Sequence, residues 1–259
     1  MLKLCRPARH VGKDREVNES QVNKAEYPER HLAEVIVGGG AHCLPEEPMS
    51  TEPSKIFHEM LLSFSQSEMA DERRSIEQAL WDDFGAEYAV FVLDMSGFSL
   101  LTRKYGIVHY LSMVRRMQMT TEPIVRSYGG FMIKYEADNC FAVFPDPLSA
   151  VNAAIAMQHA FRAENLLTSD DLDIHISCGI DYGRILVVGR EDCFGDPVNR
   201  ASKMGEDLAL AGEILITKDA LDMIPPEAGI KAREMNVSIS GITIPAYMVE
   251  YRNPQKEST

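Results

Sequence analysis

The chain has 259 residues, and 45% of them are hydrophobic, enough for a sizeable core in one large domain or in one domain with an extension. Its formal net charge of -13 argues against a general nucleic-acid binder, because phosphate backbones are held mainly by Lys and Arg. The five cysteines include no C-x-x-C pair, which disfavours a disulfide framework or a structural zinc site, so we expect a cytoplasmic protein.

The beginning of the chain has little regular pattern. Residues 1–52 mix charges, glycines and prolines, and we expect them to be disordered or loosely ordered. The basic first residues lack the apolar stretch of a signal peptide, and we expect no transmembrane segment, because no run approaches roughly 18 apolar residues. Apolar residues at helical spacing over 53–85 then predict one helix or two.

Alternating strands and helices are expected over 86–252, followed by a short tail at 253–259. The apolar patterns predict strands at 88–94, 131–136, 139–144, 174–180, 185–188, 214–217 and 246–251. They also predict a long helix with an apolar stripe over 107–117, and Pro123 falls within this helix or near its end. Asp146 and Pro147 are an N-cap and first-turn pair for another helix, which runs to about Arg162. Glycines at 129, 130 and 183 are expected to supply turns of the sheet.

Two acids stand out because each ends an apolar strand or lies at a hairpin. Asp94 ends the strand at 88–94, and one residue later come Ser96 and Gly97, whose tight turn has amides that suit phosphate oxygens. Asp138 lies where the hairpin reverses. Two carboxylates at one edge of a sheet repel unless cations lie between them, and Mg²⁺ prefers carboxylate and phosphate oxygens. The simpler alternatives are a turn-capping acid and an ordinary hairpin residue.

Three motifs together resemble the catalytic domain of the class III nucleotidyl cyclases. They are FVLDMSGFS at 91–99, GGFMIKYEAD at 129–138 and DCFGDPVNRASK at 192–203. The resemblance implies an α+β, ferredoxin-like catalytic domain at 86–252 with an N-terminal extension. It also implies a homodimer whose active sites are shared between protomers, and the helical segment at 53–85 either supports that dimer or packs on its own domain.

The resemblance assigns the two acids to metal binding. Asp94 and Asp138 match the two metal-binding acids of the family, with the Met95 carbonyl as an extra ligand, and two Mg²⁺ or Mn²⁺ ions are the implied cofactors. Ser96, Gly97 and Phe98 are the expected contacts for substrate phosphates. Two metals of this kind would activate the attacking hydroxyl and hold the leaving phosphates.

The resemblance also suggests which base is read. Lys134 and Asp192 occupy the positions that read adenine in the adenylyl-specific members. A Lys is a donor that suits the N1 acceptor of adenine, and an ionised Asp accepts from the exocyclic amine. Cytosine also presents an acceptor beside an amine, so a pyrimidine substrate stays open.

Asn199 matches the ribose-orienting Asn of the family, and Lys203 stands where the family usually has the Arg that stabilises charge on the α-phosphate. Lys keeps the charge and loses the bidentate fork. Ser240 replaces a Lys that many members place before Gly, and Ala137 replaces the Gly that commonly precedes the second metal acid. We interpret these departures as tuning or as some loss of rate.

The predicted function is an adenylate cyclase that converts ATP to 3′,5′-cyclic AMP and pyrophosphate by two-metal catalysis at a homodimer interface. One alternative is a cyclase of the same fold for GTP or a pyrimidine triphosphate. The other alternative is a dimer that binds nucleotide as a regulator with negligible turnover, which Lys203 and Ser240 suggest. A diguanylate cyclase lacks support, since no G-G-D-E-F run follows Gly129 and Gly130.

Overall fold

The computed structural model describes residues 52–239 and 242–251, which belong to a single compact unit of the chain. The predictions for residues 1–51, for Ser240 and for the tail at 253–259 therefore lie outside the described residues. Within the described ranges, no helix combines the length and the apolar character needed to cross a membrane.

The segment before the sheet forms two helices rather than one, α1 (Glu52–Gln66) and α2 (Ala70–Phe84). Phe57 of α1 is buried, meets Phe84 edge-on and stacks on Phe194 with 5.6 Å between the ring centroids. Phe194 ends the short strand β5 (Asp192–Phe194). The two helices are thus packed on their own sheet, while a role in facing a partner stays a prediction.

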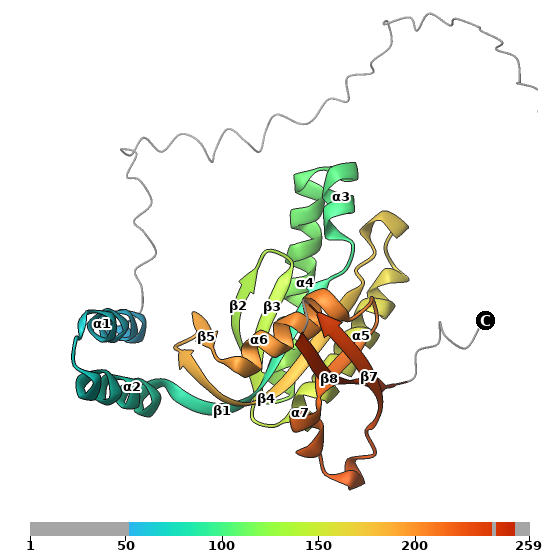
Figure 1. The fold of residues 1–259 in the computed structure, drawn as a ribbon. Coiled ribbons are helices and arrows are strands. Elements are labelled where there is room, and N and C mark those ends of the chain that lie inside the picture. Colours follow the sequence, from blue (N-terminus) through green and yellow to red (C-terminus); the bar gives the residue numbers. More distant parts are fainter. Residues whose placement is uncertain (1–51, 240–241, 252–259) are drawn as a thin grey trace, which may run out of the picture. The chain divides into compact units, whose positions relative to one another are not determined.

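The main sheet is mixed and has the strand order β2-β3-β1-β4-β6-β8-β7, with β5 paired to β4 (Figure 1). The other strands are β1 (Gly85–Met95), β2 (Phe131–Glu136), β3 (Asn139–Phe144), β4 (Ile176–Val188), β6 (Ile214–Thr217), β7 (Lys231–Ile239) and β8 (Ile242–Glu250). The helices after β1 are α3 (Phe98–Tyr105), α4 (Ile107–Ser127), α5 (Pro147–Asn165), α6 (Asp196–Ser202), α7 (Lys218–Asp222) and the short η1 (Asp170–Leu172), η2 (Lys203–Leu208) and η3 (Pro226–Ala228). The neighbours β2-β3-β1-β4 pair antiparallel, which is the order of a ferredoxin-like core.

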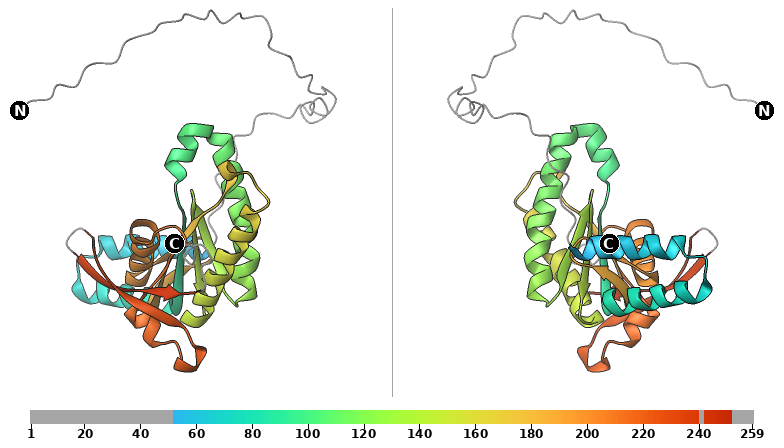
Figure 2. Two further views of the ribbon diagram at one scale, coloured as in Figure 1. Left: turned by 90° about the vertical axis from the view of Figure 1, so that its right-hand side faces the viewer. Right: turned by 90° about the vertical axis from the view of Figure 1, so that its left-hand side faces the viewer.

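The two faces of the sheet have different covers because successive side chains of β1 point to opposite faces. Phe91 and Leu93 lie in the larger core, to which α4 and α5 contribute, and Figure 2 shows these two helices side by side along the sheet. Val90 and Val92 lie in a second core with residues of α6. By this alternation Asp94 belongs to the α6 face.

Three predicted strands, β2, β3 and β6, are confirmed with the same bounds. Gly183 was expected in a turn, and that prediction is wrong. Gly183 lies inside β4 opposite Tyr88, and the strand runs on without interruption. A Cβ at this position would lie 3.0 Å from Pro197 Cγ, so the glycine lets α6 approach the strand.

Candidate active site

Asp94 and Asp138 come together at one end of the β1–β3 pair. Asp94 lies opposite Asn139 in the register, and Asp138 occupies the turn that joins β2 to β3. The pKa of Asp94 is raised to about 6, mostly by burial and then by the carboxylates of Asp138, Glu206 and Asp207 in that order. Burial also raises the pKa of Asp138. The fold therefore concentrates negative charge at the site where the sequence predicted metal ions.

The residues at this position fit a divalent cation. Half-buried carboxylates whose pKa values are raised by burial and by neighbouring acids are stabilised by a positive charge between them. The side-chain oxygen of Asn139 is buried and has no hydrogen-bond partner in the described part of the chain, so one more oxygen is available beside the two acids. Among the described residues, no group of three or more His, Cys, Asp or Glu could hold a metal. A cation here would need further oxygens, such as the Met95 carbonyl and substrate phosphates.

The turn after Asp94 is only partly available for phosphate. The Ser96 amide donates to the carbonyl of His175 at 2.8 Å, so it already has a partner. Gly97 has a left-handed backbone with φ 84° and stands immediately before α3, which begins at Phe98. The first amides of a helix have no intrahelical partner and suit anions. The expected phosphate contact therefore rests on the amides of Gly97 and Phe98 and not on that of Ser96.

Lys134 and Asp192 are far apart in the sequence and meet in the fold. Lys134 Nζ lies 3.1 Å from Asp192 Oδ1 and 3.0 Å from Glu136 Oε2. The Lys134 ammonium also lies 5.1 Å from the centre of the Phe141 ring. Asp192 Oδ1 accepts the amide of Cys193 at 2.8 Å, which helps to orient its carboxylate. The two residues that the sequence assigned to base recognition thus form one polar pair.

A β-bulge decides which face of the sheet Lys134 occupies. The register between β2 and β3 shifts between Met132 and Lys134, so Ile133 is an extra residue and Lys134 lies opposite Phe141. Phe141 belongs to the core on the α6 face. Without the shift, Lys134 would share the face of Met132, which packs with the α4 and α5 core. The sequence offered no signal for this bulge.

Asn199 and Lys203 lie one turn apart at the end of α6. The Lys203 amide donates to the Asn199 carbonyl, so the expected helical spacing is confirmed, with both residues on one side of the helix. Asn199 is exposed and Lys203 is half-buried. From Lys203 onward the helix widens into the π-helical segment η2. Such segments are rare and often occur at functional sites.

Two glycines allow this helical segment to lie very close to the sheet. A Cβ on Gly179 of β4 would lie 2.1 Å from the Ala201 carbonyl oxygen and 2.6 Å from the Gly205 amide. A Cβ on Gly205 would lie 2.9 Å from the Val92 carbonyl oxygen. This contact carries Glu206 and Asp207 close enough to affect Asp94. The sequence analysis missed both acids, because only the packing of η2 places them there.

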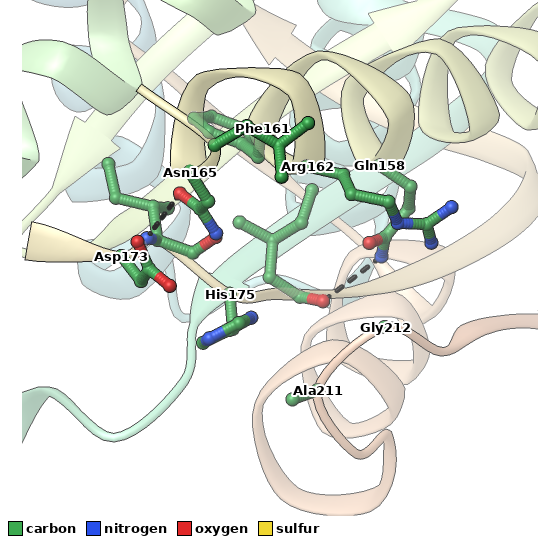
Figure 3. Close-up of a pocket in the computed structure, with 11 residues that line it drawn as sticks. Gln158, Phe161, Arg162, Asn165, Asp173, His175, Ala211 and Gly212 are labelled. Carbon is green, nitrogen blue, oxygen red and sulfur yellow. Dashed lines mark hydrogen bonds between the residues drawn. The ribbon is translucent and has the colours of Figure 1, made fainter. Parts of the chain in front are cut away.

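A cavity of about 350 Å³ lies between α5 and the start of β4 (Figure 3). Phe161 and Ile176 line it and belong to the larger core, on the face of the sheet that α4 and α5 cover. Gln158 donates to the Ile176 carbonyl at 3.0 Å, and Asn165 binds both backbone groups of Ile174. These polar side chains therefore hold the beginning of β4 in place. None of the predicted site residues in the described part of the chain lines the cavity, and we assign it no part in the chemistry.

No family model matches this chain. Over 130 residues, or 50% of its length, the chain is 33% identical to a protein of Rhizobium meliloti (strain 1021) named "Putative adenylate cyclase 3". The chain spans only about a fifth, 22%, of the length of that relative.

Solved structures of cyclase catalytic domains share the fold. An adenylyl cyclase from P. aeruginosa matches with a TM-score of 0.53 and 22% identity over 65% of this chain and 96% of its own. A guanylate cyclase domain from Catenaria anguillulae in complex with GTP matches with a TM-score of 0.54 and 20% identity over 64% of this chain and 97% of its own. The catalytic core of a rhodopsin-guanylyl cyclase with converted specificity, in complex with ATPαS, matches with a TM-score of 0.55 and 22% identity. This match covers 65% of this chain and 99% of the other.

The chain therefore has the α+β fold of the class III nucleotidyl cyclase catalytic domains. The resemblance that the three sequence motifs indicated is confirmed by this fold and by the sequence match to the curated relative. The structures of similar fold include both adenylyl and guanylyl cyclases, so the fold alone does not decide which base is bound.

Proposed function

We propose that the protein is an adenylate cyclase that converts ATP to 3′,5′-cyclic AMP and pyrophosphate. The observation that carries the proposal is the contact between Lys134 and Asp192 at 3.1 Å, on the sheet face to which Asp94 belongs. A donor and an acceptor side by side match the N1 and amino groups of adenine. Guanine has a donor at N1 beside a carbonyl. In the same arrangement the Lys donor would face the N1 donor, and the Asp acceptor would face the carbonyl.

Each site residue has a task in this reaction. Two Mg²⁺ or Mn²⁺ ions, when bound at Asp94 and Asp138, would neutralise phosphate charge and lower the pKa of the attacking 3′-hydroxyl. Asn199 orients the ribose. Lys203 places one positive charge where negative charge develops on the α-phosphate. Phosphoryl transfer depends mostly on positioning and charge neutralisation, so no further covalent chemistry is required of the protein.

The proposed assembly is a symmetric homodimer with two shared sites. One chain contains both the metal-binding acids and the α6 residues, so two identical copies suffice for two complete sites. Each site would combine Asp94 and Asp138 of one copy with Lys134, Asp192, Asn199 and Lys203 of the other. The cytoplasmic location stays a prediction, and the free, buried thiols of Cys140, Cys178 and Cys193 agree with it.

The test is a turnover assay of the purified chain with each of the four nucleoside triphosphates and Mg²⁺ or Mn²⁺, with the products separated by chromatography. We expect the parent protein to form cyclic AMP and pyrophosphate from ATP. Asp94→Ala and Asp138→Ala should form no product, although each variant should be at least as thermally stable as the parent. A preference for GTP or a pyrimidine triphosphate would overturn the base assignment. An inactive parent that binds ATP would support the regulatory dimer instead.

A further inference from the structure

An ion pair between a buried carboxylate and a half-buried Arg joins α6 to the sheet directly beside Asn199. Asp181 of β4 has no exposed side-chain surface, and its Oδ2 accepts the Nε of Arg200 at 2.5 Å. The other oxygen, Oδ1, accepts the hydroxyl of Thr217 and the amide of Tyr182. Burial raises the pKa of Asp181, and the bonds from Arg200, Thr217 and Tyr182 oppose that rise. The carboxylate is thus enclosed and bound from three sides.

Stability alone is a weak reason for such a pair. Removing the carboxylate of Asp181 from water is costly, and well-packed apolar residues often replace such an ion pair without loss of stability. What the pair does provide is direction, because a carboxylate bound by three donors accepts an Arg from one side only. A fixed Arg200 in turn fixes the rotation of the helix that carries it.

The geometry of α6 makes this rotation important for the site. At about 100° per residue, Asn199 lies about 100° from Arg200 around the helix axis, and Lys203 lies about 60° away on the same side. A small turn of the helix would therefore move both residues together. With seven residues, α6 is too short to be stable without tertiary contacts.

The apolar contacts of α6 set its distance from the sheet, and the Asp181–Arg200 pair adds a directional bond. Val198 and Ala201 are buried against the sheet, and Gly179 admits the backbone of Ala201. Small side chains of this kind permit close approach, and they lack the fixed direction of a hydrogen-bonded ion pair. Asp219 adds only a weak contact, since it lies 3.8 Å from Arg200 and is largely exposed.

We propose that Asp181 and Arg200 are positioning residues, which hold Asn199 and Lys203 in the orientation that the reaction needs. This inference rests on the proposed cyclase function. Neither residue needs to touch the nucleotide. Their loss should lower the rate of the chemical step while leaving base recognition and the metal-binding acids unchanged.

The first experiment measures kcat and KM for Asp181→Asn, with Asp219→Asn as the matched control on the exposed side of the same Arg200. We expect kcat to fall about 10- to 100-fold for Asp181→Asn, because small displacements of catalytic groups are costly, with KM for ATP within about twofold of the parent. The control should keep parental kinetics. A parental kcat for Asp181→Asn would overturn the proposal.

A second variant separates positioning from folding. Asp181→Asn with Arg200→Leu removes both charges, keeps an acceptor for Thr217 and fills the space of the Arg stem with apolar atoms. We expect this double variant to unfold at the parental temperature or above, yet to retain the reduced kcat. Full activity in a stable double variant would contradict a positioning role.

Subunit mixing gives the sharpest result. Asp181→Asn mixed with Asp94→Ala should regain activity, because one site then combines intact acids with an intact α6. Mixed with Asn199→Ala it should regain none, because both substitutions impair the same half of the site, the one that α6 supplies. Recovery with both partners, or with neither after confirmed subunit exchange, would overturn the proposal.

Hydrogen exchange tests the geometry even if the parent forms no cyclic nucleotide. In that case the cyclase function fails, whereas the anchoring of α6 still predicts faster amide exchange over 196–205 in Asp181→Asn than in Asp219→Asn. Exchange in β1 should stay slow in both variants. Equal protection of α6 in the two variants would refute the anchor itself.

Discussion

Replacing Asp94 by Asn should make the metal-free protein more stable at neutral pH while it abolishes turnover. The pKa of Asp94 is raised from 3.8 to about 6 by burial and by Asp138, Glu206 and Asp207. The folded protein therefore holds this proton more tightly than the unfolded chain does. By linkage, the metal-free protein loses stability as the pH rises from about 4 to about 6, and the loss persists above that range.

The size of the effect follows from the shift. A rise of about two pKa units corresponds to about 3 kcal/mol at about 1.4 kcal/mol per unit. Asp94 is only half-buried, so solvent screening reduces this value, and we expect about 1 kcal/mol. For a protein of this size, such a gain raises the Tm by about 2–4 °C. Asn cannot ionise, so Asp94→Asn should show this gain above pH 6 and little of it near pH 4.

The assay is thermal unfolding in a chelator at several pH values between 4 and 8. Asp83→Asn, which changes an exposed acid of α2, is the matched control and should not alter the pH dependence. Adding Mn²⁺ with a non-reacting ATP analogue should stabilise the parent much more than Asp94→Asn. A Tm difference between parent and Asp94→Asn that is the same at pH 4 and pH 8 would refute the charge argument.

Three further predictions concern the base-reading pair, Lys203 and Ala137. Lys134→Glu with Asp192→Cys should weaken ATP use and move the preference toward GTP, and an unchanged ratio of the two rates would remove both residues from base recognition. Lys203→Ala should lower kcat about 100-fold or more with little change in KM, which corresponds to roughly 2.7–4 kcal/mol for one preorganised donor. Lys203→Arg should keep or raise activity, and a fully active Lys203→Ala would exclude a catalytic role. Ala137 has a left-handed backbone with φ 53°, so Ala137→Gly should raise the free energy of unfolding by roughly 0.5–1 kcal/mol in denaturant titrations. A loss of stability in that variant would show that Ala137 is unstrained.

Local patterns explain where sequence analysis succeeded. The strands β2 and β3 flank a two-residue turn, and their apolar residues occur in short runs with turn residues at each end, so their bounds were confirmed. The strand β7 was missed because its first half, Lys231–Glu234, is mostly charged, and apolar residues alternate with polar ones only from Met235 to Ile239. As an edge strand it has a neighbour on one side only, which relaxes the demand for apolar side chains.

Sequence by itself determined the chemical identity of the candidate site. Asp94 at the end of an apolar strand, Asp138 in a hairpin turn and Asn199 with Lys203 one turn later are local features, and each follows from the periodicity of the element that carries it. The family resemblance of the three motifs rests on the same local order.

Only the tertiary structure decided which of these residues meet and on which face. The bulge at Ile133 turns Lys134 toward Asp192, and the close contact of Gly179 with the α6–η2 segment brings Glu206 near Asp94. The pairing of Asp181 with Arg200 has no local signal, since it joins a strand to a helix across 19 residues of sequence. Contacts between distant segments depend on sheet register and on packing distance, and neither is encoded in a single stretch of the chain.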